Sequence, residues 1–135
     1  MRRKTVLLAD DDIDDREMFK EILSDNKQVQ LAGSVENGQE LLGFLLQLEP
    51  TSLPDLIVLD HNMPKMNGLQ TLDALKKSGD YQHIPVVIFS TYCDNKLLTE
   101  CANLGAAMVF TKPSSFDEYE NMITAFLKII PSNQQ

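Results

Sequence analysis

Residues that could bind a metal ion or a phosphoryl group follow directly after four short apolar segments of this 135-residue chain. They are Asp10, Asp11 and Asp12 after the first segment, then Asp60, Ser90 with Thr91, and Lys112. Two carboxylates about 4 Å apart repel by roughly 4 kcal/mol at an effective dielectric constant near 20, so such a cluster needs a cation, a proton or solvent. Because oxygen ligands without histidine or cysteine favour Mg²⁺ over zinc, the pattern predicts a magnesium site suited to phosphoryl chemistry.

These residues can meet only if the segments before them form neighbouring strands. Five short apolar runs have the character of buried parallel strands: residues 5–9, 29–32, 56–59, 86–89 and 108–111. Amphipathic helical patterns lie between and after them, at residues 14–24, 39–48, 69–77, 95–104 and 115–130. Alternating strands and helices form a parallel sheet covered on both faces, and a closed barrel needs about 250 residues. We therefore expect an open, doubly wound α/β fold of five parallel strands, whose functional crevice lies beyond the carboxyl ends of the strands.

Composition excludes several classes of protein. The chain has 43% hydrophobic and 24% charged residues, which is typical of a single globular domain. A net charge of -8 disfavours direct binding to nucleic acid, whose affinity comes from Lys and Arg at phosphates. No apolar run approaches the roughly 18 residues of a membrane span, and the apolar stretch after the basic N-terminus is too short for a signal peptide. Cys93 and Cys101 lack partners at metal-ligand spacing, so we expect free thiols and a cytoplasmic protein without membrane association.

Four stretches of the chain also resemble a known family. They are residues 7–12 (LLADDD), 56–68 (LIVLDHNMPKMNG), 84–90 (IPVVIFS) and 105–113, which ends in Lys112-Pro113. Together, and in this order, they resemble the receiver domain of two-component response regulators. The resemblance implies a flavodoxin-like (βα)5 fold with strand order 2-1-3-4-5, and one receiver domain over residues 1–135 with no output domain. It also implies that the protein is no enzyme beyond its own phosphorylation and dephosphorylation.

The resemblance assigns the acidic residues to phosphoryl transfer with Mg²⁺. Asp60 is expected to be the phosphoacceptor, and its carboxylate needs no general base because it is already ionised at neutral pH. Asp11 is expected to bind Mg²⁺ directly and Asp10 through water, while Asp60 and the main-chain carbonyl of Asn62 complete the ligands from the protein.

The same resemblance assigns the remaining polar residues and the partners. Lys112 is expected to pair first with the Asp60 carboxylate and then with phosphoryl oxygens. Ser90 is expected to hydrogen-bond a phosphoryl oxygen and to pull its loop inward. The expected partners are a histidine kinase or phosphotransfer protein and a downstream protein that the sequence does not identify.

Several positions depart from the family pattern or have ordinary structural explanations. Thr91 stands where the family usually has a smaller residue, and Val109 replaces a common aromatic residue, so the familiar inward turn of a ring cannot operate there. Lys112-Pro113 resembles the family's cis peptide. Asp14 and Asp15 are interpreted as acids that favour the positive end of a helix, and His61 as an incidental loop residue.

Three alternative functions stay open at this stage. A phosphatase similar to the haloacid dehalogenases also uses an aspartyl nucleophile, but the segment from Asp10 to Ile13 lacks its Asp-x-Asp context and no acidic pair follows a late strand. A flavodoxin-like cofactor carrier would need hydroxyls and glycines in the first loop, where five aspartates would repel a phosphate. A module that binds partners without phosphorylation would not need all the chemical positions to be filled.

Overall fold

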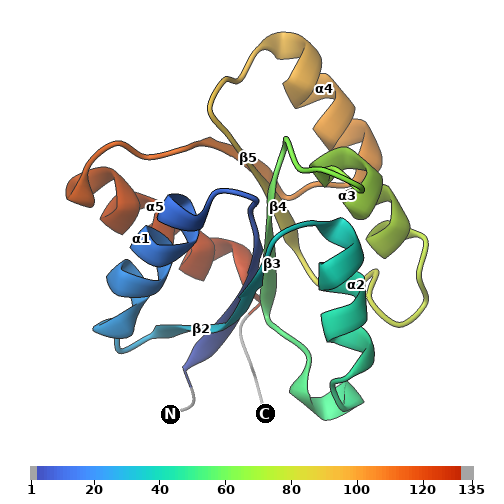
Figure 1. Cartoon of the computed structure of the whole chain (residues 1–135), viewed down its shortest axis with the longest axis horizontal. Helices are drawn as coiled ribbons and strands as arrows, with labels where there is room; N and C mark the ends of the chain where they lie inside the picture. The colour runs from blue at the N-terminus through green and yellow to red at the C-terminus, as the bar shows by residue number, and fades with distance from the viewer. Residues whose placement is uncertain (1–2, 132–135) are drawn as a thin grey trace.

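The computed structural model describes residues 3–131 and arranges them around one sheet of five parallel strands (Figure 1). The strands are β1 (Lys4–Ala9), β2 (Val29–Val35), β3 (Leu56–Asp60), β4 (Val86–Ser90) and β5 (Met108–Thr111), in the order β2-β1-β3-β4-β5. The helices are α1 (Ile13–Ser24), α2 (Gly38–Leu46), α3 (Gly68–Lys76), α4 (Asn95–Leu104) and α5 (Phe116–Ile129), with a 3₁₀ turn, η1 (Pro50–Ser52), before β3. The doubly wound α/β class and the strand order expected from the sequence are confirmed.

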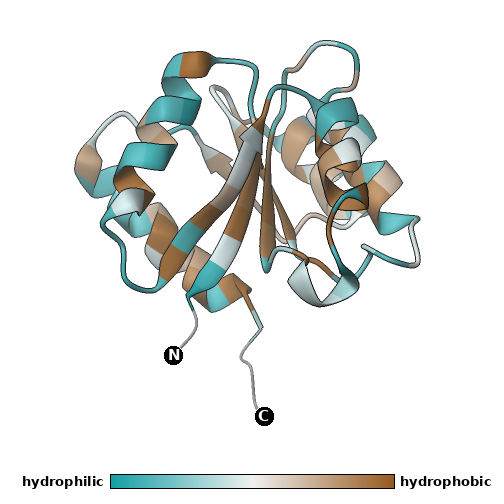
Figure 2. Ribbon diagram, turned by 60° about the horizontal axis from the view of Figure 1, so that its bottom comes forward, coloured by the Kyte–Doolittle hydropathy of each residue, from teal (hydrophilic) through white to brown (hydrophobic). Residues whose placement is uncertain are grey.

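Helices cover both faces of the sheet. Helices α1 and α5 lie on one side, and α2, α3 and α4 lie on the other (Figure 1). Successive side chains of a strand point to opposite faces, so Val6 and Leu8 pack in the core beside α1 and α5, and Leu7 and Ala9 pack in the core opposite. Apolar residues therefore run along the central strands without alternation, and the outward helix faces are largely hydrophilic (Figure 2).

Aromatic rings fill the core beneath α1 and α5. The Phe19 ring lies edge-on to those of Phe89 and Tyr119 at centroid distances of 6.0 and 6.5 Å, and stacks on Phe126 at 6.3 Å. Phe110 of β5 meets Phe126 edge-on at 5.6 Å. These contacts fix α1 and α5 against β4 and β5, whose carboxyl ends carry Ser90 and lead into Lys112.

Each α-helix begins after a polar residue that caps it. The side chains of the five N-cap residues each accept a backbone N–H from the first turn, and these residues are Asp12, Asn37, Asn67, Asp94 and Ser115. This capping satisfies donors that have no partner within the helix. All five caps stand in loops that leave the carboxyl ends of the parallel strands, the edge where the candidate site lies.

Strand β2 is longer than the apolar pattern predicts. The sequence indicates a strand over residues 29–32, whereas pairing with β1 continues through Gly33 and Ser34 to Val35. A shift in register between Val6 and Leu7 skips one residue of β2 before the pairing resumes. Because β2 is an edge strand, it can carry exposed or polar residues after the apolar run ends.

The expectation of a cis bond between Lys112 and Pro113 is wrong. No peptide bond between residues 3 and 131 is cis. The trans isomer is favoured by about 0.5–1 kcal/mol for bonds that precede proline. Every such bond among the described residues is trans. None of the helices formed by these residues is long and apolar enough to cross a membrane.

Candidate functional site

Parallel pairing brings the polar residues of four strand ends to one edge of the sheet (Figure 1). Asp60 is the last residue of β3 and stands opposite Phe89 of β4, while Ser90 stands opposite Thr111 of β5. Backbone pairing continues one step further, because the Lys112 N–H donates to the Ser90 carbonyl at 2.7 Å. Asp10 follows β1 and is tied by its N–H to the β2 carbonyl of Val35 at 3.0 Å.

Three of the predicted acids come together at this edge. Asp10, Asp11 and Asp60 each have a carboxylate oxygen within 4.8 Å of the others, and this is the one grouping of its kind among residues 3–131. Asp10 and Asp60 are buried, whereas Asp11 is exposed. One oxygen of each buried acid is already engaged: Asp10 Oδ1 accepts the Asp12 N–H at 2.9 Å and Asp60 Oδ1 accepts the Asn62 N–H at 3.3 Å.

The acidic cluster carries more negative charge than its neighbouring ammonium can offset. The second oxygens of the buried pair, Asp10 Oδ2 and Asp60 Oδ2, both face the Lys112 ammonium, at 3.2 and 3.4 Å, and Asp10 Oδ2 is fully buried with no well-directed hydrogen bond. The available donors are carboxylate oxygens, which suit a hard cation, and Asp11 keeps the cluster open to solvent. The residues present therefore fit a metal such as Mg²⁺.

Burial and mutual repulsion disfavour charge on the two inner carboxylates. Desolvation, followed by the charge of Asp10, raises the pKa of Asp60 from 3.8 to about 7. Desolvation also raises the pKa of Asp10, although the Asp12 N–H and Lys112 lower it in part. A bound cation would favour the ionised forms of both groups and so lower these pKa values.

The Lys112 ammonium lies among three carboxylates. Its Nζ is 3.4 Å from Asp60 Oδ2, 3.2 Å from Asp10 Oδ2 and 2.7 Å from Asp15 Oδ2. It also lies 5.5 Å from the centroid of the Phe89 ring. Hydrogen bonding to Asp15 and the charges of Asp10 and Asp60 outweigh desolvation and raise the pKa of Lys112 above its usual range.

Asp15 is the residue that the sequence interpretation missed. The acid was assigned to the helix N-terminus alone, yet it makes the shortest contact to Lys112. Its position four residues before the buried Phe19 places it on the inward stripe of α1, whereas its neighbour Asp14 is exposed. The four-residue spacing from Asp15 to the apolar Phe19 was the sequence signal that could have placed Asp15 on the inward side of this helix.

The Ser90 side chain is hydrogen-bonded to the backbone of its own loop in this structure. Ser90 is buried at the end of β4, and its Oγ donates to the Tyr92 carbonyl at 2.6 Å and accepts the Tyr92 N–H at 3.2 Å. Thr91 and Tyr92 are exposed. The serine hydroxyl is therefore engaged by the loop that leads to α4, rather than by the acids.

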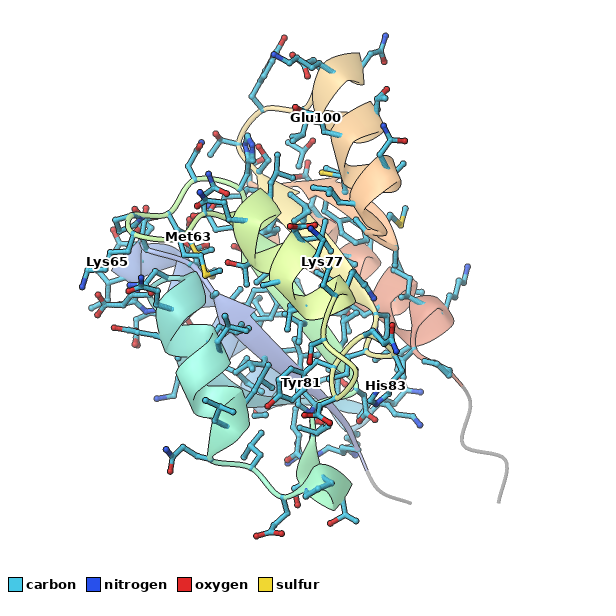
Figure 3. The ribbon with its side chains drawn as sticks, turned by 90° about the vertical axis from the view of Figure 1, so that its right-hand side faces the viewer. Met63, Lys65, Lys77, Tyr81, His83 and Glu100 are labelled. Carbon is cyan, nitrogen blue, oxygen red and sulfur yellow. The ribbon has the colours of Figure 1, made fainter. Side chains whose placement is uncertain are left out.

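The loop from β3 to α3 closes tightly around Asp60. The Gly68 N–H donates to the His61 carbonyl at 3.2 Å, and a Cβ on Gly68 would stand 2.5 Å from the Asp60 carbonyl oxygen. Asn67 and Gln70 cap α3 reciprocally, as an Asn before Gly allows. Figure 3 shows Met63 and Lys65 in this loop, at the end of the molecule opposite Tyr81 and His83. Only a residue without a side chain fits at position 68.

The loop after β1 has a support that the sequence did not reveal. Arg16 of α1 donates from Nη1 to the Asp10 carbonyl oxygen at 2.7 Å, and its Nη2 lies 3.9 Å from Glu36 Oε2. This bond joins the first turn of α1 to the backbone of a site acid. Arg16 therefore helps to hold the acidic loop in place, and its role depends on helical phase, as that of Asp15 does.

Comparisons with solved structures support the fold. The phosphorylated cyanobacterial phytochrome response regulator RcpA is 25% identical with a TM-score of 0.82, covering 99% of this chain and 98% of that one. The Mn²⁺-bound response regulator Rcp1 is 26% identical with a TM-score of 0.80, covering 96% and 99%. The response regulator domain of Thermotoga maritima CheB has a TM-score of 0.81 at 23% identity, which supports the fold alone, over 98% of this chain and 100% of that chain.

Sequence comparisons give the family. A curated relative, the protein-glutamate methylesterase/protein-glutamine glutaminase of Clostridium acetobutylicum, is 33% identical over 132 residues, which cover 96% of this chain and 36% of the relative. The enzyme of the same description from Bacillus subtilis is 34% identical, covering 85% of this chain and 32% of its own. The chain thus spans about a third of the length of these relatives. The family model of the response regulator receiver domain matches residues 6–124, and the chain therefore belongs to the receiver domain family of two-component response regulators.

Proposed function

We propose that this protein takes a phosphoryl group onto Asp60 from a phosphohistidine of a histidine kinase or phosphotransfer protein. The observation that carries the proposal is the cluster of Asp10, Asp11 and Asp60 oxygens within 4.8 Å of one another, with the Lys112 ammonium 3.4 Å from Asp60. A receiver domain with these residues at one edge of its sheet has the charges that phosphoryl transfer requires.

The transfer forms one bond and breaks another. An oxygen of the Asp60 carboxylate attacks phosphorus, the bond from phosphorus to the imidazole nitrogen breaks, and the histidine keeps that electron pair and takes up a proton. Asp60 attacks as the carboxylate, and although burial raises its pKa to about 7, a bound cation would keep it ionised, so no general base is needed. The loose transition state spreads negative charge over the phosphoryl oxygens, where the Lys112 ammonium can stabilise it.

Mg²⁺ is the proposed metal, held by Asp11 directly, by Asp10 through water, by Asp60 and by the main-chain carbonyl of Asn62. Bound there, it neutralises charge on the acids and on the phosphoryl oxygens. Rcp1 is described in a Mn²⁺-bound form, and that similarity supports the proposal of a divalent ion at the acidic residues here. The clustering of Asp10, Asp11 and Asp60, with the Lys112 ammonium already shared by Asp10, Asp15 and Asp60, supports the same assignment.

Ser90 is the proposed switch residue. Its hydroxyl donates to the Tyr92 carbonyl in this structure, so donation to a phosphoryl oxygen requires release of that carbonyl. Release changes the loop from Thr91 to Asp94 and the start of α4, and thereby alters a surface available to a downstream protein. The proposal gives the chain one receiver domain over residues 1–135, acting by partner binding or onward transfer and not by turnover of another substrate.

Two further points belong to this proposal. The catalytic activity in the name of the methylesterase relatives belongs to those proteins, of whose length this chain spans about a third, and forms no part of this proposal. A cytoplasmic location is proposed because Cys93 and Cys101 are free thiols, as is usual in a reducing compartment.

The test is intact-mass spectrometry after incubation with Mg²⁺ and acetyl phosphate, a small acyl phosphate donor. Wild-type protein and Asp14→Asn, which removes an exposed acid nearby, should gain one phosphoryl group, while Asp60→Asn should gain none. Chelation of the metal should abolish the gain. An equal gain in Asp60→Asn would overturn the proposal, and no gain in the wild type would favour a module that binds partners without phosphorylation.

A further inference from the structure

The Lys112 ammonium makes its shortest contact with a residue to which neither the proposed chemistry nor the family pattern gives a role. Asp15 Oδ2 lies 2.7 Å from Lys112 Nζ, whereas Asp60 Oδ2 lies 3.4 Å away. The Lys112 side chain is 13% exposed and that of Asp15 is 28% exposed, so solvent only partly screens the pair. The resting ammonium is therefore held more closely by α1 than by the phosphoacceptor.

The two contacts compete for one group. An ammonium has three N–H donors on a flexible stem, and here three carboxylates already surround it, from Asp10, Asp15 and Asp60. A phosphoryl group on Asp60 would add oxygens that need one of these donors. Asp10 is buried at the end of β1, whereas Asp15 sits on the first turn of α1 with partial exposure and can be hydrated when the lysine leaves.

We propose that Asp15 is a positioning residue that holds the Lys112 ammonium toward α1 while Asp60 is unphosphorylated, and that it gives up the ammonium to the phosphoryl group. This inference rests on the proposed function. It makes the first turn of α1 a second place, beside the loop after β4, where phosphorylation changes the contacts of the protein. It also makes Asp15 a brake on phosphoryl uptake, because the ammonium must leave Asp15 before it stabilises the transition state.

Loss of the contact between Asp15 and Lys112 should raise the rate of phosphorylation, which can be measured. Asp15→Asn should raise the rate of Asp60 phosphorylation by acetyl phosphate about fivefold, which corresponds to an ion pair worth about 1 kcal/mol. The increase should appear in the maximal rate at saturating donor, because the change acts on the position of Lys112. Asp15→Glu keeps the charge on a longer side chain and should restore a rate near that of the wild type.

Asp14→Asn is the matched control. It removes the same charge from the next position of the same helix, but Asp14 is exposed and lies outside ion-pair distance of Lys112. Its rate should equal that of the wild type. An equal acceleration in Asp14→Asn and Asp15→Asn would mean that general charge repulsion of the donor acts here, and it would overturn the positioning role.

A second readout is NMR spectroscopy, first without metal and then with a phosphoryl mimic. In NMR spectra of the metal-free protein, Asp15→Asn should shift the side-chain Cε and Hε signals of Lys112, and Asp14→Asn should leave them unchanged. In the wild type, beryllofluoride with Mg²⁺ should shift the carboxyl carbon of Asp15 as its ammonium partner leaves. An unchanged Asp15 carboxyl signal would contradict the release.

The outcomes separate this inference from the proposed function. If the wild type gains a phosphoryl group and Asp15→Asn gains it at the same or a lower rate, the role of Asp15 fails and phosphorylation of Asp60 stands. If neither protein gains one, the proposed function fails and the release fails with it. Thermal melts of wild type and Asp14→Asn should match, because Asp14 is exposed, while Asp15→Asn should melt slightly lower, because it loses the partly buried ion pair with Lys112.

Discussion

Burial and the repulsion of neighbouring carboxylates raise the pKa values of Asp10 and Asp60 at the edge of the sheet. Burial and Asp10 raise the pKa of Asp60 to about 7, and the single ammonium of Lys112 is shared by Asp10, Asp15 and Asp60. The site is therefore poorly satisfied without a cation and well arranged to receive one.

The first prediction concerns Asp60 and pH. Its folded-state pKa is raised above the ordinary 3.8, so its contribution to stability is fully present below pH 3.8 and is lost as the pH rises through 7. Because Asp60→Asn removes the titrating group, we expect the metal-free variant to be more stable than wild type at pH 8, by at most about 4 kcal/mol, with a smaller difference at pH 5. Urea unfolding at both pH values measures this.

The same experiment with Mg²⁺ supplies its control. The metal should stabilise wild-type protein more than Asp60→Asn, and more at pH 8 than at pH 5, because it binds the ionised carboxylates. A wild type and a variant whose stabilities depend identically on pH would contradict the assignment of the raised pKa to Asp60.

The second prediction separates two acids of the first loop. Asp11 belongs to the three-carboxylate cluster, whereas the exposed Asp14 does not. We expect Asp11→Asn to weaken Mg²⁺ binding by about tenfold or more, and Asp14→Asn to change it little, because a metal ligand contributes more than a distant charge. Metal titration by calorimetry measures both, and equal effects would refute the distinction.

Most residues of the site could be predicted because they come directly after apolar strands. The contacts that could not be predicted depend on which side of a helix a residue faces or on the geometry of a loop. Asp10, Asp60, Ser90 and Lys112 were expected at the sheet edge because each ends or follows an apolar strand. The contact of Asp15 with Lys112 was not expected, because an acid near a helix N-terminus has an ordinary explanation. The engagement of the Ser90 hydroxyl by Tyr92 depends on backbone torsions that the pattern does not encode.

At the scale of elements, loops and caps position the site. The sequence pattern located all five strands and all five α-helices, since apolar runs bounded by Asp, Asn, Gly or Pro mark them clearly. The pattern ended β2 at residue 32, because the apolar run stops there, whereas backbone pairing with β1 continues to Val35. The cis bond expected before Pro113 was wrong.

The third prediction concerns Gly68, the first residue of α3. A Cβ there would stand 2.5 Å from the Asp60 carbonyl, and the obstacle is backbone that cannot rotate away. We expect Gly68→Ala to destabilise the protein by about 2 kcal/mol and to slow phosphorylation of Asp60, because the loop beside the acceptor must shift.

Gly43→Ala provides the matched control. Gly43 lies within α2, and a Cβ there meets nothing within 4 Å. Because alanine is the better helix former, this variant should gain up to about 1 kcal/mol and phosphorylate normally. Urea denaturation and phosphorylation rates measure both variants, and a Gly68→Ala protein as stable and as active as wild type would contradict the close approach.

At the scale of the whole molecule, the site is joined to α4 and α5 through strands β4 and β5. Phe89 lies next to Ser90 and packs against Phe19, and Phe110 packs against Phe126 of α5. Val109 packs in the opposite core, on the side of α3 and α4, where it offers no ring to rotate. We therefore expect a change at the site to reach these helices through the Ser90 loop and the strand ends.

The fourth prediction follows from this connection. Beryllofluoride, a phosphoryl mimic, should shift the amide NMR signals of residues 92–96 and of α5 more than those of residues 29–33, because Ser90 and Lys112 precede the former and β2 lies at the far edge of the sheet. Ser90→Ala should reduce the shifts at residues 92–96. Uniform shifts, or shifts confined to residues beside the metal, would contradict this route.

The fifth prediction tests the central claim, which is that Asp60 accepts the phosphoryl group. Protein treated with Mg²⁺ and acetyl phosphate is reduced with borohydride, which converts an aspartyl phosphate to homoserine, and its peptides are sequenced by tandem mass spectrometry. We expect homoserine at position 60 and at no other aspartate, with none formed when the metal is chelated. Homoserine at position 10, 11 or 15, or a phosphoryl group on His61 or Ser90 with position 60 unmodified, would contradict it.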